Sequence, residues 1–406
     1  MKILTKKLQT SLVKSIYLHI PFCGIVCPFC PFTVKRDRLN LHEKYIFGVL
    51  NEIEYRVGIL NEIDLLANEK KTMRKNYLES LYIGGGTPSR LKMHNVSLLI
   101  KKIKNIFPWS KKIEISFEMN PEDVTEKYLN DLYEIGVNRI SLGGQSFQTS
   151  ILKQLGRSHS SHELREAIEI IRNSAIKNWN LDLIFGVPKQ SFLKFKDDLE
   201  EALIYRPSHI SLYGLEIHKK TRFGKDQEII NWELNNRDLF REMYLWAINR
   251  LKKSHLFQYE VSNFSQKGKE SRNNLLVWSG YEYLGFGIGA HSFFKRMRWS
   301  NKNSIKLYLD DLHKKIMPVG FEEELSKKQL ATEFIMLSLR QRKGFNIDVW
   351  QNKFGLELKK KQLDFTKSLC DSGLAFWEDN NLCLTPKGFL ISDRIILEIL
   401  PFNSII

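Results

Sequence analysis

The sequence has few cysteines and no long hydrophobic segment. Five cysteines occur among 406 residues, and no run of about 18 uncharged apolar residues is found, so we expect no transmembrane segment. The cysteines follow no paired pattern, which favours a reducing cytoplasmic location over a disulfide-bonded secreted fold. The basic amino terminus lacks the uninterrupted apolar core of a secretory signal, so export is not expected.

Acidic residues are scarce relative to basic ones, and the formal net charge is +16. Such an excess suits an anionic partner, such as nucleic acid, a membrane surface or a polycarboxylate. The basic residues are mostly scattered lysines, however, a pattern that general solubility also explains. No RNA-binding module is recognisable, so we do not expect a nucleic-acid partner. Peripheral association with a membrane stays an alternative to a purely cytoplasmic protein.

Short β-rich segments alternate with amphipathic segments along the first half of the chain. Apolar residues recur at helical spacing between the predicted strands, for example in residues 45–67 and 161–175. Strand and helix alternation predicts right-handed βαβ units around a parallel sheet. Six units are too few for a closed eight-stranded barrel, so we predict an α/β fold, a partial, open (β/α)6 barrel similar to a TIM barrel. The six strands are predicted at residues 15–20, 80–86, 112–120, 139–147, 180–188 and 209–217.

The order of predicted strands, helices and turns divides the chain into four segments. Residues 1–14 form an amino-terminal extension, and residues 15–230 form the partial barrel. Residues 231–320 extend the barrel. Residues 321–406 form a small, mainly helical domain of winged-helix character. We expect a helix at 235–253 and a strand near 259–264, then packed turns in the glycine-rich segment 281–294, and a helix capped by Thr385-Pro386.

Unusual residues stand where five of the predicted strands end. In barrel-like α/β folds the carboxyl ends of the strands build the active site, so these residues predict one enzyme-like pocket. Taken singly, each of these polar residues is also explained by a structural role as a helix cap or as a partner in a hydrogen bond. Together they suit a ligand with hydroxyls, an amine and a carboxylate. The unusual residues at the strand ends are the cysteine loop (23–30), the GGGTPS stretch (84–89), Glu118, Gln145 and Asp182, and Arg157 lies beyond the end of the fourth strand.

Cys23, Cys27 and Cys30 lie in one loop with the spacing C-x3-C-x2-C. Three thiolates can bind three irons of a [4Fe–4S] cluster and leave the fourth iron open to a small molecule. Two other interpretations stay open from spacing alone: a zinc site completed from elsewhere, and buried structural cysteines. Cys370 and Cys383 belong to the distal domain and are poor fourth ligands.

The GGGTPS stretch lacks the lysine of a P-loop and the G-x-G-x-x-G spacing of a dinucleotide fold. Its glycines allow a ligand to approach the backbone and expose N–H groups to a carboxylate or phosphate. A tight turn without a ligand is the alternative.

The order and spacing of these motifs, with GVNRISLGGQSF, LGRSH and NLDLIFGVPKQ, resemble the radical S-adenosylmethionine (SAM) enzymes of the oxygen-independent coproporphyrinogen III oxidase group. The resemblance runs from Tyr17 to the carboxyl terminus. It implies a [4Fe–4S] cluster on Cys23, Cys27 and Cys30, with the amine and carboxylate of SAM on the fourth iron. It implies that Tyr17, Gly85 and Glu118 contact that SAM. Phe29, Gly86, Thr87, Gln145, Arg157 and Asp182 match positions associated with a second SAM in the oxidases.

Within this group the sequence is most similar to the HemW branch, the heme chaperones. The oxidases carry a further cysteine at the position of Phe32. The resemblance implies binding of heme or a porphyrin, transfer of heme to an acceptor protein, and an electron donor. The alternative is a catalytic radical SAM enzyme that decarboxylates or methylates a porphyrin or another substrate, so the sequence leaves enzymatic activity undecided.

Two positions depart from the HemW pattern. Pro31 replaces an aspartate, and Asn273 replaces the histidine of an H-N-x-x-Y-W motif implicated in heme binding. An asparagine is not among the usual axial ligands of heme iron. His291 lies nearby in the sequence, where it is either a ligand or a packed histidine.

Overall fold

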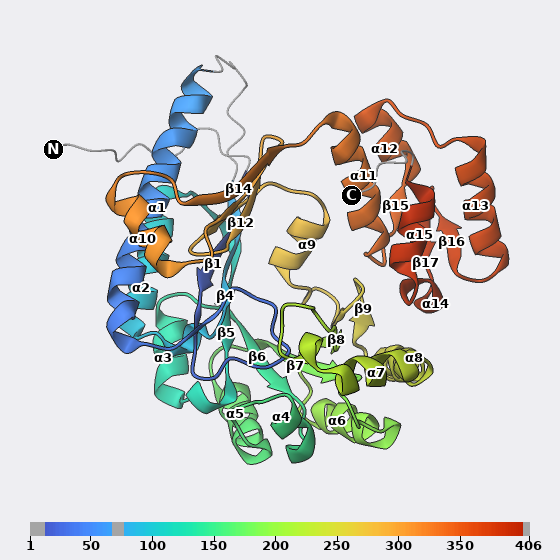
Figure 1. The fold of residues 1–406 in the computed structure, drawn as a ribbon, viewed down its shortest axis with the longest axis horizontal. Helices are drawn as coiled ribbons and strands as arrows, with labels where there is room; N and C mark the ends of the chain where they lie inside the picture. Colours follow the sequence, from blue (N-terminus) through green and yellow to red (C-terminus); the bar gives the residue numbers. More distant parts are fainter. Residues whose placement is uncertain (1–12, 67–76, 401–406) are drawn as a thin grey trace.

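A single large sheet organises the barrel and its extension. The computed structural model describes residues 13–66 and 77–400 (Figure 1). Within them, a twelve-stranded sheet has the order β14-β13-β12-β11-β1-β4-β5-β6-β7-β8-β10-β9. The strands from β11 to β8 in this order run parallel to their neighbours, and the strands outside them pair antiparallel. The parallel part confirms the predicted barrel strands.

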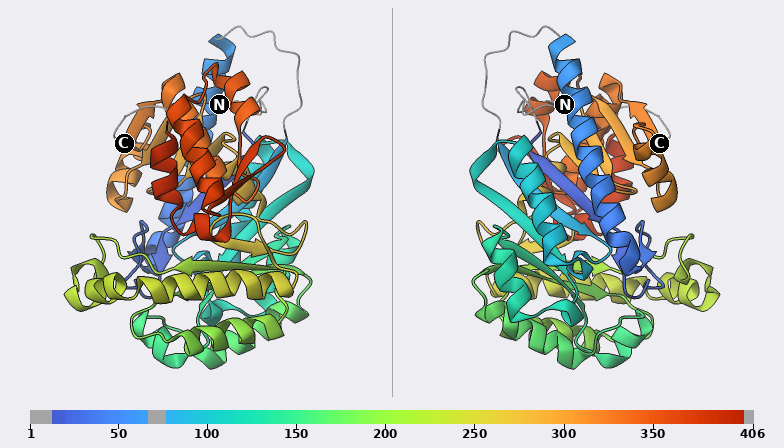
Figure 2. Two further views of the ribbon diagram at one scale, coloured as in Figure 1. Left: turned by 90° about the vertical axis from the view of Figure 1, so that its right-hand side faces the viewer. Right: turned by 90° about the vertical axis from the view of Figure 1, so that its left-hand side faces the viewer.

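The predicted strands are β1 (Ser15–Ile20), β4 (Leu78–Gly85), β5 (Trp109–Met119), β6 (Arg139–Gln145), β7 (Asn178–Phe185) and β8 (His209–Gly214). A helical segment follows each of the first five, and these segments cover the outside of the curved sheet (Figures 1 and 2). The fold is therefore the partial (β/α)6 barrel that the sequence predicts. The covering helices are α1 (Leu39–Leu66), α2 (Met93–Ile106), α3 (Glu126–Glu134), α4 (Thr149–Gln154), α5 (Ser161–Asn173) and α6 (Phe192–Ile204).

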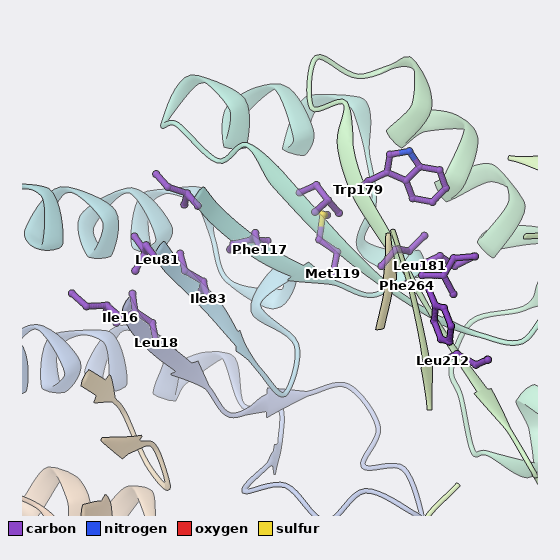
Figure 3. Packing of buried hydrophobic residues seen from close by; sticks show 14 of the residues in the cluster. Ile16, Leu18, Leu81, Ile83, Phe117, Met119, Trp179, Leu181, Leu212 and Phe264 are labelled. Carbon is purple, nitrogen blue, oxygen red and sulfur yellow. The ribbon is translucent and has the colours of Figure 1, made fainter. Parts of the chain in front are cut away.

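The two faces of these strands differ in polarity. Apolar side chains pack between the sheet and the helices (Figure 3), including Ile16, Leu18, Leu81, Ile83 and Phe117. Neighbouring residues of a strand face opposite sides of the sheet. The residues that alternate with these apolar ones therefore point into the barrel. On β1 these are Ser15, Tyr17 and His19. The interior of the barrel is thus polar, and the hydrophobic core lies outside it.

The structure corrects the prediction of packed turns for the glycine-rich segment 281–294. This segment does not form only packed turns, because β11 (Tyr283–Phe286) and β12 (His291–Phe294) pair within it. β11 also pairs in parallel with β1 and extends the sheet. A Cβ atom on Gly285 would lie 2.1 Å from the carbonyl oxygen of His291, so this glycine permits the close approach of the two strands. The sheet continues through β13 (Met297–Asn301) and β14 (Val319–Glu324).

The other edge of the sheet follows the predictions more closely. The predicted helix at 235–253 is α8 (Arg237–Lys253), which a separate helix α7 (Gln227–Asn235) precedes. Of the predicted strand near 259–264, only the last two residues lie in a strand, β10 (Asn263–Ser265), and a separate short strand, β9 (Phe257–Gln258), precedes the predicted range. Two helices, α9 (Arg272–Trp278) and α10 (Ile305–His313), complete this part of the chain. In the part of the chain that the structure describes, no helix is long and apolar enough to span a bilayer.

The carboxyl-terminal part has the element order of a winged helix. Five helices surround a sheet of order β15-β17-β16, and Thr385 caps α14 by accepting from the N–H of Gly388. Helix α14 contacts α8 of the barrel, which joins the two parts. The elements are α11 (Lys327–Leu339), β15 (Phe345–Asn346), α12 (Ile347–Phe354), α13 (Lys360–Asp371), β16 (Ala375–Glu378), β17 (Asn381–Leu384), α14 (Pro386–Phe389) and α15 (Ser392–Ile399).

A buried carboxylate joins α1 to the extension of the sheet. Glu52 is inaccessible to solvent and accepts hydrogen bonds from the Tyr308 hydroxyl (2.6 Å), the Asn301 amide (2.7 Å) and the Gly287 N–H (2.9 Å). Arg56, one turn further along α1, donates to the same carboxylate at 3.3 Å. These contacts satisfy the charge of Glu52 and fix α1 against β11, β13 and α10.

We expect Glu52→Ala to destabilise the fold by about 3–5 kcal/mol, because it leaves the Arg56 cation buried without a counter-charge. Urea unfolding followed by circular dichroism measures the loss. Glu54→Ala is the control on the same helix, since Glu54 is about half exposed and pairs with Lys102 at the surface. It should cost no more than about 1 kcal/mol. Equal losses in the two variants would contradict the role given to Glu52.

Candidate functional site

A cavity of about 1010 Å³ opens at the carboxyl ends of the parallel strands. The predicted site residues gather there although they come from separate loops and strands. Tyr17 is the exception, since it lies on β1 beside the cavity and its ring stacks on Tyr82 with 6.1 Å between centroids. The site residues that line the cavity are Cys23, Cys27, Phe29, Cys30, Gly85, Gly86, Thr87, Glu118, Gln145, Arg157 and Asp182.

The cysteine loop is closed by short strands at its base. β2 (Phe22–Cys23) pairs in parallel with β3 (Lys35–Arg36), so the chain leaves the sheet at Cys23 and returns beside it. Within the loop, the N–H of Cys30 donates to the carbonyl of Cys27 at 3.2 Å. The three cysteines therefore lie on one turn of chain that faces the cavity.

The glycine turn after β4 packs directly against this loop. The N–H of Gly86 donates to the carbonyl of Ile20 at 2.7 Å. A Cβ atom on Gly86 would lie 2.9 Å from the sulfur of Cys23 and 2.8 Å from the backbone of Pro21. A side chain has no room here, so the glycine lets the two motifs meet.

Burial changes the pKa of two of the cysteine thiols. It raises the pKa of Cys23 to about 12 and also raises the pKa of Cys30. The Arg157 guanidinium lies 3.7 Å from the sulfur of Cys27 and supplies positive charge beside it. Burial thus disfavours the thiolate forms of Cys23 and Cys30, and the positive charge of a bound metal centre would favour them.

The donor set fits an iron–sulfur cluster better than one ion. Among the described residues, no three His, Cys, Asp or Glu side chains are gathered closely enough to hold a single metal ion. A [4Fe–4S] cluster needs a different arrangement, because each thiolate binds its own iron. Three cysteines around one cavity offer three such ligands and leave the cavity side for a fourth.

Glu118 lies across the cavity from the cysteines, at the end of β5. Its carboxylate accepts from the Tyr82 hydroxyl at 2.7 Å and from the N–H of Gly85 at 2.9 Å. Burial, with Asp182 as a second negative charge, raises the pKa of Glu118 to about 7. A cationic or amine-bearing ligand would relieve this cost by pairing with the carboxylate.

Asp182 belongs to a hydrogen-bond network inside the barrel. Its carboxylate accepts from the Asn180 amide at 2.6 Å and from the Ser141 hydroxyl at 3.5 Å. Asn180 in turn contacts the ring of His209 at 2.6 Å. Burial raises the pKa of Asp182 as well, so two carboxyl groups of the cavity are held in surroundings that disfavour their charge.

Gln145 occupies a strained backbone position at the end of β6. Its φ angle is 67°, in the left-handed region, and the pairing of β6 with β7 shifts register between Leu142 and Gln145. Such bulges redirect a side chain at the rim of a sheet, and the strain persists only where the surroundings fix it. The bulge presents Gln145 to the cavity.

Several cavity residues were not singled out from the sequence. Asn120 accepts from Arg157 at 2.8 Å and donates to the Thr87 hydroxyl at 3.3 Å, which links three of the motifs. Its position two residues after Glu118 and directly before Pro121 was the available signal. The far wall had no such signal, because it combines residues of β8 and the loop after it with α8 and, through the packing of α14 on α8, the carboxyl-terminal part of the chain. That wall includes Tyr213, His218, Arg237, Phe240, Arg241, Tyr244, Phe389, Leu390 and Ile391.

Asn273 and His291 lie outside the cavity. Asn273, on α9, accepts from the hydroxyl of Ser15 at 2.7 Å. Ser15 begins β1, so Asn273 lies at the opposite end of the barrel from the cysteine loop. His291 is exposed on β12, where it pairs with Ser300 of β13. The structure does not bring either residue to the predicted cluster ligands.

Known proteins are similar to this chain in sequence and in fold. Residues 17–202 match the radical SAM superfamily, and residues 325–391 match the HemN C-terminal domain. Heme chaperone HemW of Bacillus subtilis is 30% identical over 94% of this chain and 98% of its own length. Heme chaperone HemW of Escherichia coli is 32% identical over 68% of this chain and 69% of its own. The structure of coproporphyrinogen III oxidase (HemN) from Escherichia coli, a radical SAM enzyme, superimposes with a TM-score of 0.78 at 19% identity over 96% of this chain and 91% of that one.

We expect Gly86→Ala to push the glycine turn away from Cys23 and to destabilise the fold by about 1–3 kcal/mol. Iron and sulfide retained after anaerobic reconstitution should fall, because Cys23 is displaced. Gly24→Ala is the control in the same loop, since a Cβ atom there meets nothing within 4 Å. Normal iron and sulfide in Gly86→Ala, or an equal loss in Gly24→Ala, would show that the close approach is unimportant.

Proposed function

The chain belongs to the HemW family of the radical SAM superfamily, and we propose that it binds a [4Fe–4S] cluster and SAM and passes heme to an acceptor protein. The observation that carries the proposal is the meeting of three cysteines, a glycine turn and a buried glutamate around one cavity. These groups come from three different strand ends. Their convergence is hard to explain if each served only its own turn.

Each group has a distinct role in this proposal. Cys23, Cys27 and Cys30 hold three irons, and the cluster supplies one-electron chemistry when bound. Glu118 accepts hydrogen bonds from the amine of SAM, and the backbone beside Gly85 contacts the same end of the molecule. Asp182 and Gln145 face the rest of the cavity, where they can position a hydroxyl or amine group of a ligand.

The far wall suits a heme. Arg237 and Arg241 stand one turn apart on α8 and can pair with the propionate carboxylates. Phe240, Tyr244 and Phe389 offer apolar surface to the macrocycle. The volume of about 1010 Å³ is at the upper end of the usual range for ligand pockets, about 300–1,000 Å³, which leaves room beside a bound SAM. We therefore place heme in this cavity, away from Asn273.

His218 would be the residue that holds the iron of a heme bound in this cavity. It lines the cavity in the loop after β8, and its side chain is 46% exposed. An imidazole is a common axial ligand of heme iron, whereas the amide of Asn273 is not. His218 would thus supply an imidazole for the heme iron, which the motif around Asn273 lacks.

Heme titration of the cluster-loaded protein tests the proposal. Heme should bind stoichiometrically at micromolar protein with a shifted Soret band and then move to an added apo-hemoprotein. His218→Ala should alter the Soret band and weaken binding at least tenfold, whereas His162→Ala, on the exposed face of α5, should change neither. Failure of the wild-type protein to bind heme would refute the chaperone function. Binding unaffected by His218→Ala would refute only its iron ligand.

The affinity for SAM should depend on pH through Glu118. The ionised carboxylate pairs best with the amine and the sulfonium cation of SAM, and the pKa of Glu118 is raised to about 7. Below that pKa, binding must first remove the proton, so affinity should fall by up to about tenfold per pH unit. Calorimetry between about pH 6 and 8 measures this slope.

Glu118→Gln should weaken SAM binding and reduce its pH dependence to the part that the α-amino group of SAM contributes, since that group itself titrates at about pH 8. Glu126→Gln, at an exposed position of α3, is the control and should keep both the affinity and the slope. A wild-type affinity that is constant across this pH range would exclude Glu118 as the group that pairs with SAM.

A further inference from the structure

We propose that the outer face of the cysteine loop is a docking surface for an acidic protein that carries one electron. This inference rests on the proposed cluster, since the electron would pass to it. We call this face the loop rim. It consists of three exposed apolar residues, Ile25, Val26 and Phe32, and seven exposed basic residues, Lys35, Arg36, Arg38, Lys219, Lys220, Arg222 and Lys225.

Two segments far apart in the sequence bring the basic residues of the loop rim together. Arg36 on β3 pairs with Cys23 on β2, so one basic segment runs beside the cysteines. The other segment, residues 218–225, is attached to the opposite limb of the loop. There the N–H of Phe223 donates to the carbonyl of Pro28 at 3.1 Å, and Arg222 donates to the carbonyl of Val26 at 3.4 Å. In Figure 2 the dark blue loop lies next to the yellow-green segment in both views.

The loop rim is far more basic than the chain as a whole. Lys and Arg occupy seven of the fourteen positions in residues 33–38 and 218–225, against 62 of 406 in the full sequence. Within the described part of the chain, none of the seven forms an ion pair. The carboxylate of Asp37, which lies among them, is engaged by His42 at 2.6 Å and Arg90 at 3.1 Å. The seven cations of the loop rim therefore face solvent without an ion-pair partner among the described residues.

Not all charges near the loop rim are positive. Glu216 pairs with His218 at 3.4 Å, and Asp226 caps α7 by accepting from the N–H groups of residues 228 and 229. Both lie at the ends of the second basic segment rather than within it. They reduce the excess of positive charge without reversing it.

This arrangement suits a transient partner of opposite charge. Exposed apolar groups ringed by charge are typical of small interfaces, and weak redox complexes bury less than about 1,200 Å². Unpaired cations accelerate encounter with an acidic protein and orient it on the surface. Cys27 and Cys30 are themselves partly exposed, so a carrier seated on the loop rim would approach the cluster ligands closely. One electron would leave the reduced carrier and enter the oxidised cluster, with no bond formed or broken.

The test compares two double variants with equal changes in charge. Lys219→Glu with Lys220→Glu alters the loop rim but no proposed ligand of the cluster, SAM or heme. Lys111→Glu with Lys112→Glu is the control, because this exposed pair lies near the start of β5, at the opposite end of the barrel. Reduced flavodoxin, an acidic flavoprotein, serves as the carrier, and loss of the cluster's visible absorption in an anaerobic stopped-flow instrument gives the rate. Dithionite, which needs no docking surface, is the second reductant.

We expect the loop-rim variant to be reduced by flavodoxin at least tenfold more slowly than the wild type. The control should keep the wild-type rate, and added salt should slow only proteins with an intact loop rim. Equal rates in the two variants would overturn the proposal. So would a loop-rim variant that accepts electrons normally but no longer passes heme to an apo-hemoprotein, because the surface would then serve the heme acceptor. Absence of the visible absorption, iron and sulfide from the reconstituted wild type would refute the cluster itself.

Discussion

The parallel pairing of β1 with β4 is the constraint on which the site depends. It places Ile20 opposite Gly85, so the chain segments that leave both strands emerge side by side. One segment becomes the cysteine loop and the other becomes the glycine turn. A shift of one residue would turn every side chain of β4 to the other face of the sheet. The glycine at position 86 is then required, because the two segments approach too closely for a Cβ atom.

The polar interior of the barrel follows from the same strand geometry. Alternation along β5 and β7 sends Phe117, Met119 and Leu181 outward to the helices and leaves Glu118 and Asp182 inside. Burial raises the pKa of both carboxyl groups, so their ionisation has a cost that the apolar core outside the barrel must offset. A ligand with an amine or a cation would remove part of this cost. The site is therefore built to favour such a ligand over water.

The spacing of hydrophobic residues predicted the helices and strands that local sequence determines. It did not predict the features that depend on contacts between residues far apart in the sequence. The six barrel strands and α8 were found from hydrophobic spacing, because each buries an apolar face against its neighbours along the chain. The strand β11 was missed, because its glycines resemble turns and its partner β1 is distant in the sequence. Asn120 was given no role, since its contacts with Arg157 and Thr87 appear only when three loops meet. The roles of the predicted ligands stay predictions until a cluster and SAM are bound.

The position of Asn273 bears on how a heme could be held by this chain. Its side chain accepts from Ser15 at the amino end of β1, at the far end of the barrel from the cysteines. A heme at α9 would therefore be separated from the cluster by the length of the strands. A heme on the cavity wall would instead lie beside SAM, close to His218 and the two arginines of α8. The contact of α14 with α8 places Phe389 over that same wall, so the carboxyl-terminal domain completes the cavity. A chaperone must release what it holds, and an exposed imidazole at the edge of an open cavity leaves a path for that release.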